Sequence, residues 1–304
     1  MADHKFEKDT TNWVFVSGQT EPRHLFDIIH AVHTLKLKGV SEDRIFIFTD
    51  RPGAAIHLEE YGIKAKHNEL REMEERMTAL PSAANLVMCV TGHGLPNGIP
   101  VMRGISLEKT ISPTQILKCA RSCKDQKVGV LVLTQCYAGI FNFSDARTEP
   151  KVVLIGSAEL DLSLSPSMQL KVPIPNINPK EPALAEWNAN IFMLTLFKWL
   201  EAPSDIDGDG ALTLLDAYKS AGANSHLFLR NLKTSLSLNL EEWLIEPSRS
   251  VRDARAKTGS ITEAEQQELL AREQTIKQQA DILYINPVPW ILHADLARAI
   301  KILL

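Results

Sequence analysis

The first two thirds of the chain alternate short apolar runs with stretches of helical periodicity. Apolar residues recur at helical spacing from Leu25 to Leu35, for example, and Gly39 ends that stretch. Five apolar runs are predicted as strands: residues 13–17, 44–49, 85–91, 128–134 and 151–156. Continuous apolar strands that alternate with helices are typical of a parallel sheet covered on both faces. The pattern therefore predicts an α/β fold, a three-layer αβα sandwich with a mostly parallel sheet.

Local signals predict further elements. Ser112, Pro113 and Gln115 form the pattern of a capped helix start, and a charged helix is expected over 68–80. Residues 163–182 are rich in Ser, Pro and Asn and predict a long surface loop. We expect an apolar helix over 183–200, then an acidic loop and another helix. Ser260 and Glu263 predict a second capping box that opens a polar helix, and an extended run and an apolar helix are expected in 281–304.

Composition and charge exclude several classes of function. The 304 residues are 44% apolar and 23% charged, which is ordinary for a soluble globular protein. A net charge of −4 gives no basic surface for nucleic acid and no polybasic membrane segment. The longest apolar run, 191–200, contains Lys198 and is too short to span a bilayer. We expect no nucleic-acid or membrane partner.

The cysteine pattern indicates a reducing compartment. Four cysteines, at 89, 119, 123 and 136, do not form the framework of a disulfide-rich protein. The first residues have mixed charge and no apolar stretch, so no secretory signal is expected. These features predict a cytoplasmic protein with free thiols.

Two reactive side chains follow neighbouring predicted strands. His93 comes after the third run and is flanked by Gly92 and Gly94, whereas Cys136 comes after the fourth run, three residues before Gly139. Ligands bind at the carboxyl ends of parallel strands, so both side chains belong at the functional edge. A thiolate is a strong nucleophile, and a nearby imidazole can pass a proton to a leaving amine. Each residue alone also fits a turn or core position, but together they indicate nucleophilic catalysis.

These motifs resemble those of a known family. Val-Thr-Gly-His-Gly at 90–94 and Leu-Thr-Gln-Cys-Tyr-Ala-Gly at 133–139 resemble the His-Gly and Cys-x-x-Gly motifs of caspase-like cysteine peptidases. The likeness is greatest to the legumain group. Residues 23–45 also resemble the legumain segment that leads from the first strand through a helix to the second strand. The similarity covers about residues 12–165.

The resemblance implies a role for each matching residue. His93 corresponds to the catalytic histidine and Cys136 to the nucleophile, with the backbone N–H groups of Gly94 and Cys136 holding the oxyanion. Arg23 matches the arginine of the S1 pocket, where a guanidinium favours Asp or Asn at P1. Ser163 falls where legumain contributes a pocket serine.

Two positions depart from the family. Glu21 stands where legumain has an asparagine that helps to hold its histidine, and Thr134 stands where legumain has a glutamate. The metacaspase branch has an aspartate at the position of Thr134, which supports basic P1 residues. Thr134 therefore argues against that branch.

An acidic loop at 205–216 has the spacing of a calcium site. Asp205, Asp207 and Asp209 precede Gly210, and side-chain oxygens follow at Thr213 and Asp216. Six to eight such oxygens suit Ca²⁺, although Asp216 is shorter than the usual glutamate and should weaken the affinity. Similar loops occur in bacterial caspase-like peptidases. In the alternative interpretation the aspartates only cap the following helix.

Other residues that could ligate metal have structural interpretations. Cys119 and Cys123 are four residues apart without a companion Cys/His pair, so zinc is not expected there. His24, His30 and His33 accompany an apolar stripe and are interpreted as flanking a packed helix face.

The sequence therefore predicts a cysteine endopeptidase that cleaves proteins or peptides after Asp or Asn. Residues 1–225 would form the caspase-like catalytic domain, and 226–304 an extension that completes it or packs on it. Calcium dependence and synthesis as a zymogen are further hypotheses, with self-cleavage at Asp145, Asp161 or Asp253. The alternatives are a non-catalytic regulatory or scaffold protein on this fold and a transamidase-like acyl transferase.

Overall fold

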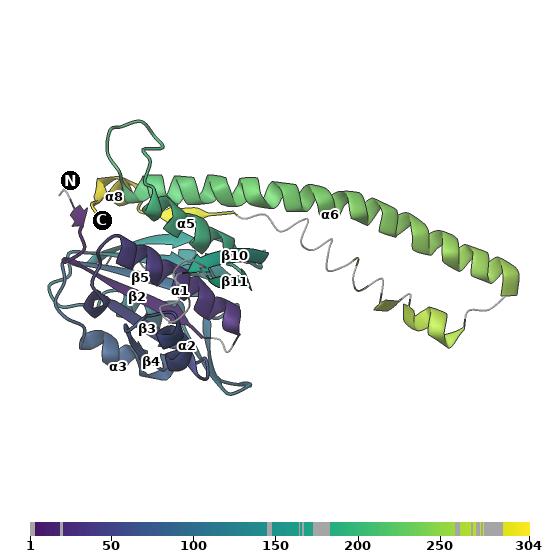
Figure 1. Cartoon of the computed structure of the whole chain (residues 1–304), viewed down its shortest axis with the longest axis horizontal. Coiled ribbons are helices and arrows are strands. Elements are labelled where there is room, and N and C mark those ends of the chain that lie inside the picture. Colours follow the sequence, from purple (N-terminus) through teal and green to yellow (C-terminus); the bar gives the residue numbers. More distant parts are fainter. Residues whose placement is uncertain are drawn as a thin grey trace. The chain divides into compact units, whose positions relative to one another are not determined.

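A seven-stranded sheet organises the chain, with the strand order β12-β9-β8-β5-β2-β3-β4. All neighbouring pairs are parallel except β12 and β9. The strands are β2 (Thr11–Ser17), β3 (Ile45–Thr49), β4 (Lys66–Asn68), β5 (Asn85–Thr91), β8 (Val128–Leu133), β9 (Lys151–Gly156) and β12 (Trp290–Leu292). Every residue of β2, β5 and β8 is buried, which explains their continuous apolar sequences. The mostly parallel α/β fold predicted from the sequence is confirmed (Figure 1).

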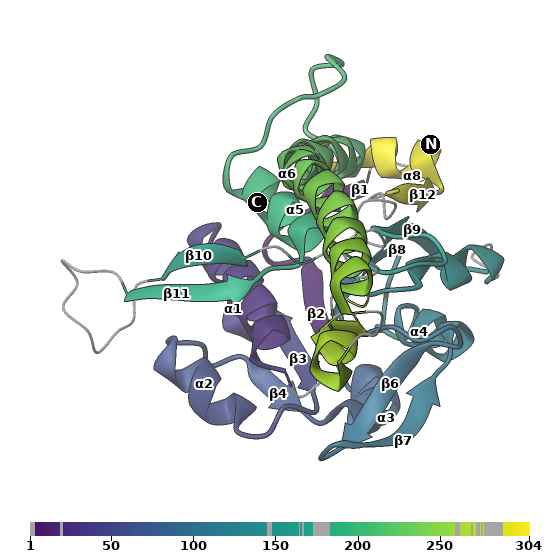
Figure 2. The ribbon, with the colours of Figure 1, turned by 90° about the vertical axis from the view of Figure 1, so that its right-hand side faces the viewer.

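Helices cover both faces of this sheet (Figure 2). On one face α1 (Pro22–Leu37) packs beside α5 (Ile191–Glu201), whose Phe197 ring lies 6.3 Å from Trp13 and 5.9 Å from Phe15. On the other face α3 (Met73–Thr78) and α4 (Pro113–Cys119) share a core cluster with Val14 and Val16. Alternate residues of β2 thus face opposite helical layers, as the pleat of a strand requires.

Shorter elements surround the sheet. The helical ones are η1 (Glu42–Arg44), α2 (Ala54–Glu60), η2 (Leu70–Glu72), η3 (Ala138–Phe143), α6 (Leu214–Thr258) and α8 (Ala294–Ala299). The strands are β1 (His4–Phe6), β6 (Ile99–Arg103), β7 (Ser106–Ile111), β10 (Ser167–Val172), β11 (Ala183–Asn188) and β13 (Ile300–Ile302). β10 pairs with β11 and contacts α1, whereas β6 pairs with β7 and β1 with β13.

The capping box at Ser112 is confirmed. Its hydroxyl accepts the backbone N–H of Gln115, whose side chain accepts the N–H of Ser112. The second box is shifted by two residues, because Thr262 pairs with Glu265. Ser260 lies outside the described residues.

Three predicted elements were wrong in type or length. The loop predicted over 163–182 contains strand β10, and the helix predicted from residue 183 starts instead with strand β11. α5 begins only at Ile191, because the side chain of Asn190 accepts the N–H of Met193 and caps the helix there. The predicted helix over 68–80 is shortened to η2 and α3.

The structure describes every residue except 1–3, 19–20, 145–147, 164, 166, 173–182, 259–261, 269, 272–273, 275 and 277–287. Residues 1–223 and 287–304 form one compact unit, and residues 224–286 form a second. The C-terminal residues thus belong to the first unit, where β12 extends the sheet and the Trp290 indole donates to the carbonyl of Ala158. Within the described residues, no helix combines the length and apolar character needed to cross a bilayer.

Candidate active site

The candidate site lies where the strand order of the sheet reverses. β2 pairs with β3 on one side and with β5 on the other, so the chain leaves β2 in one direction and later returns to its opposite edge. Such a switch point is the usual place for a ligand in an open α/β sheet. The segments after β2, β5 and β8 supply Glu21, His93 and Cys136, respectively.

His93 and Cys136 lie close enough for each side chain to shift the pKa of the other. Gly94 makes this approach possible, because a Cβ atom there would collide with the carbonyl oxygen of Cys136. Gly92 has a φ of 108°, which a side chain would disfavour. The glycines that flank His93 therefore have a geometric role beside the predicted nucleophile.

The thiol of Cys136 is prepared for ionisation. Burial alone would raise its pKa, but hydrogen bonds from His93 and from the backbone N–H groups of Ser163 and Gly94 outweigh burial and lower the pKa. The N–H of Ser163 lies 3.2 Å from Sγ. A lowered pKa is typical of a reactive cysteine.

The other three cysteines show the opposite behaviour. All four are free, but Cys89, Cys119 and Cys123 are buried, whereas Cys136 is partly exposed. Burial raises the pKa of all three buried thiols, that of Cys119 to about 12. Cys136 is thus set apart from the others by its surroundings.

The loop that carries Cys136 is held by the segment after β9. Tyr137 adopts a left-handed conformation with a φ of 57°. Its N–H donates to the carbonyl of Asp161 at 2.8 Å, and the N–H of Gly139 donates to that of Glu159 at 3.0 Å. These bonds place the backbone of Ser163 against the sulfur of Cys136.

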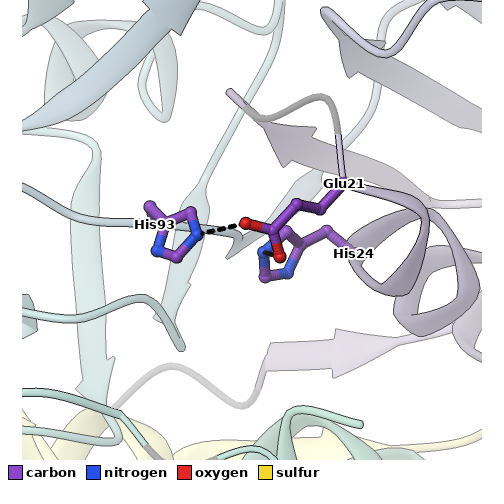
Figure 3. A group of neighbouring side chains, drawn as sticks. All are labelled: Glu21, His24 and His93. Atoms are coloured by element: carbon purple, nitrogen blue, oxygen red, sulfur yellow. Dashed lines mark hydrogen bonds and ion pairs between the residues drawn. The ribbon is translucent and has the colours of Figure 1, made fainter. Parts of the chain in front are cut away.

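Glu21 is a candidate functional residue that the sequence analysis noted only as a departure from the legumain pattern. Its Oε1 lies 2.8 Å from Nε2 of His93 (Figure 3). Its Oε2 accepts a hydrogen bond from Nε of Arg23 at 2.6 Å. Burial opposes ionisation of Glu21, but these two partners lower its pKa to about 2. The pKa of His93 is raised, first by its hydrogen bond to Cys136 and then, against burial, by Glu21. Cys136, His93 and Glu21 thus form a chain of three interacting groups.

Arg23 lies beside the histidine. Its second guanidinium nitrogen is 3.5 Å from Nε2 of His93, and its side chain is 24% exposed. The predicted S1 residue is therefore close to the dyad, and its charge is compensated by Glu21.

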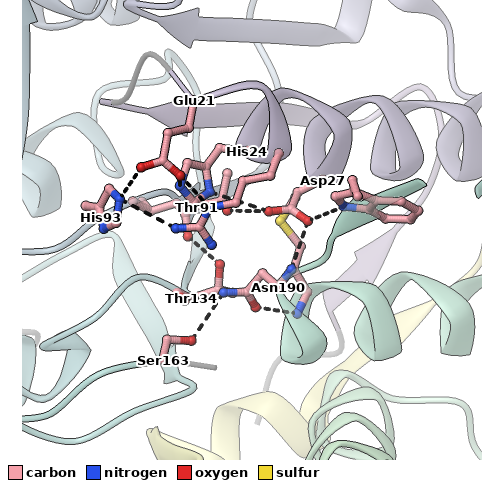
Figure 4. A network of polar contacts seen from close by, with 12 residues as sticks. Glu21, His24, Asp27, Thr91, His93, Thr134, Ser163 and Asn190 are labelled. Carbon is pink, nitrogen blue, oxygen red and sulfur yellow. Dashed lines mark hydrogen bonds and ion pairs between the residues drawn. The ribbon is translucent and has the colours of Figure 1, made fainter. Parts of the chain in front are cut away.

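A buried polar network lies beneath these groups (Figure 4). Oδ1 of Asp27 accepts from the Trp187 indole and the N–H of Asn190, and Oδ2 accepts from the Thr91 hydroxyl, each at 2.9 Å. Asp27 is 3% exposed, and it ties α1 to the end of β5 and to the start of α5. The capping position before the apolar run at 191 was the sequence signal that could have identified Asn190.

Asn190 extends this network to two residues of the sequence analysis. Its Nδ2 donates to the carbonyl of Thr134 and to Oγ of Ser163. The hydroxyl of Thr134 in turn donates to the carbonyl of Val90, so this side chain ties β8 to β5. Ser163 contacts the nucleophile through its backbone, while its hydroxyl is held by Asn190.

The structure divides the predicted calcium ligands into two groups. Carboxylate oxygens of Asp205, Asp207 and Asp209 lie within 4.8 Å of one another, as a shared cation would require. Asp205 and Asp209 also accept backbone N–H groups of the loop. Asp216 lies outside this cluster and accepts the N–H groups of Ile206 and Asp207 and both the N–H and the hydroxyl of Thr213. The donor set of the three leading aspartates fits a hard cation, whereas Thr213 and Asp216 cap α6.

Two positively charged side chains also lie beside this loop. Lys219 and Arg298 lie 3.3 and 3.4 Å from Oδ2 of Asp207. A bound cation would compete with both of them for this carboxylate.

The structure describes two of the three predicted self-cleavage positions. Asp161 is exposed and adjoins the Cys136 loop, and Asp253 lies within α6. Asp145 lies outside the described residues.

Neither a scan of protein-family models nor a search of curated proteins finds a significant match to the chain.

Proposed function

We propose that the chain is a caspase-like cysteine endopeptidase with Cys136 as its nucleophile. One observation carries the proposal: at the switch point of the sheet, the Cys136 thiol lies beside His93, whose Nε2 is 2.8 Å from the ionised Glu21. A nucleophile, a base and a group that orients the base are the parts that covalent acyl transfer needs.

The reaction follows from these contacts. The Cys136 thiolate attacks the peptide carbonyl carbon, and the N–H groups of Gly94 and Cys136 stabilise the oxyanion. The C–N bond breaks as protonated His93 gives its proton to the amine, which leaves a thioester. Water then attacks the thioester, His93 takes the proton, and release of the acid restores the thiolate. Glu21 stabilises the imidazolium and fixes its ring.

The side-chain specificity in this proposal depends on Arg23. Its guanidinium can form paired hydrogen bonds with the side chain of Asp or Asn at P1. Glu21 already accepts from Arg23, so an acidic P1 side chain would compete with Glu21 for the same donor group. Ser163 would line the same pocket.

A panel of fluorogenic peptides tests this function. Peptides with Asp, Asn, Arg or Lys at P1 are incubated with the reduced protein, with and without calcium. We expect cleavage after Asp or Asn that is abolished in Cys136→Ala and retained in Cys119→Ala, which alters a buried thiol at the end of α4. Absence of cleavage under every condition would favour a non-catalytic role. Product transfer to an added amine, in place of hydrolysis, would indicate a transamidase.

We also propose that Asp205, Asp207 and Asp209 bind Ca²⁺. The proposal is supported by the convergence of three carboxylates in a loop that leads into α6. Calorimetric titration with calcium chloride tests it directly. The absence of any binding heat would leave the helix cap as the role of the loop.

A further inference from the structure

A second cluster of metal-ligating side chains includes the candidate catalytic histidine. Glu21, His24 and His93 each offer a ligand atom, and these atoms lie within 4.8 Å of one another. Figure 3 shows the Glu21 carboxylate between the two imidazole rings, with His24 extending from α1. The rings meet edge to face at an angle of 77°, so they do not stack on each other.

His24 supplies an independent sign that a ligand belongs here. The residue is only 3% exposed, yet neither of its ring nitrogens has a hydrogen-bond partner. The nearest carboxylate oxygens are 3.8 Å away on Asp27 and 4.0 Å away on Glu21, beyond hydrogen-bond distance. Buried polar groups in native proteins are nearly always satisfied, and an ion is one way to satisfy them.

We propose that Glu21, His24 and His93 bind a divalent transition-metal ion of the zinc class. Two imidazoles and one carboxylate are a donor set typical of zinc, with one coordination position left open. Bonds of about 2.0–2.1 Å in a tetrahedral site place ligand atoms about 3.3 Å apart. Nε2 of His93 lies 2.8 Å from Oε1 of Glu21, and Nε2 of His24 lies 4.0 Å from Oε2, so the present distances lie on either side of that spacing.

Arg23 is the group that the ion must displace. It donates to Glu21 and lies 3.5 Å from His93, but this ion pair is partly exposed, with side chains 24% and 45% accessible. Ion pairs of this kind are easily exchanged for water. The guanidinium can therefore turn to solvent while the metal takes its place on the carboxylate.

The metal would act as an inhibitor of the proposed peptidase, a consequence that rests on the proposed function. Coordination occupies a nitrogen lone pair of His93 and the carboxylate that stabilises its protonated form. His93 then cannot carry the proton to the leaving amine, so chemistry stops while the fold is unchanged.

The binding experiment does not depend on activity. Full-length Cys136→Ala protein is titrated with zinc chloride by calorimetry, with a competing chelator of known affinity. We expect one equivalent to bind, with an affinity at least about 100-fold weaker after His24→Phe, which removes one ligand. Phenylalanine suits the position because the ring is buried without hydrogen bonds. His57→Gln is the matched control, since it removes an exposed histidine that pairs with Glu60.

Circular dichroism identifies any variant that fails to fold. In that case Glu21→Gln in the same Cys136→Ala background replaces His24→Phe. Unchanged zinc affinity in a folded His24→Phe or Glu21→Gln protein would overturn the proposal, as would the absence of zinc binding to the parent.

Inhibition is then measured in protein that retains Cys136. We expect zinc to abolish peptide cleavage by the parent and to spare His24→Phe. Equal inhibition of both would overturn the inhibitory role. If no peptide is cleaved at all, the proposed function fails, while the calorimetric result on the metal site still stands.

Discussion

Replacing Glu21 by Gln should shift the basic limit of the pH range of activity to lower pH. The carboxylate is 2.8 Å from Nε2 of His93, and the two side chains are 45% and 40% exposed. Unit charges at this separation in a solvent-like dielectric interact by about 1.5 kcal/mol, and screening reduces this to about 1 kcal/mol. Because one pKa unit corresponds to about 1.4 kcal/mol, loss of the anion should move deprotonation of the imidazolium down by somewhat less than one pH unit. Arg23, left without its anion, opposes the imidazolium charge and acts in the same direction.

The pH profile of kcat/KM for a P1 Asp or Asn peptide measures this change. Activity requires the thiolate–imidazolium pair, so the basic limb reports the loss of the proton from His93. Imidazole NMR titration in the Cys136→Ala background gives a second reading that needs no turnover. Glu60→Gln is the control, because it removes a carboxylate 3.1 Å from another histidine, His57, far from Cys136 in the sequence. A basic limb that stays in place in Glu21→Gln would refute the role given to Glu21.

Three further changes test other parts of the site. Gly94→Ala should reduce kcat/KM at least about 100-fold, since its Cβ would push the histidine loop away from Cys136; wild-type rates would show that the loops need not touch. Asp27→Ala leaves three buried donors without an acceptor and should lower the free energy of urea unfolding by about 3 kcal/mol; a loss below about 1 kcal/mol would contradict the network. Asp207→Asn should weaken calcium binding at least about tenfold by calorimetry, whereas an unchanged affinity would place the ion elsewhere.

The central strands could be predicted because burial dictates their composition. β2, β5 and β8 have helices or sheet neighbours on every side, so their sequences are almost purely apolar. The failures lie at elements whose sequences carry a mixed signal. The sequence of β11 mixes apolar and polar residues and leads directly into the apolar residues of α5. The boundary between the two elements is set by the helix cap at Asn190.

The proximity of His93 and Cys136 could be predicted because strand ends are recognisable in a sequence. His93 and Cys136 follow buried strands directly, and parallel pairing of β5 with β8 brings them to one edge. Asp27 could not be found in this way, because its partners Thr91, Trp187 and Asn190 are 64 to 163 residues away in the sequence. Patterns within one segment of a sequence do not reveal contacts between residues so far apart.

Glu21 differs from the asparagine that legumain has at the corresponding position, yet its side chain can still hold the histidine. An asparagine at this position can hold a histidine only through hydrogen bonds, whereas the carboxylate of Glu21 adds a charge that favours the imidazolium. The same charge also compensates Arg23, so the candidate S1 pocket has little net charge. In the proposed peptidase, discrimination between Asp and Asn at P1 would then come from hydrogen-bond geometry around the guanidinium more than from its charge. In the proposed peptidase, one carboxylate would thereby couple proton transfer by His93 to the side-chain specificity of the S1 pocket.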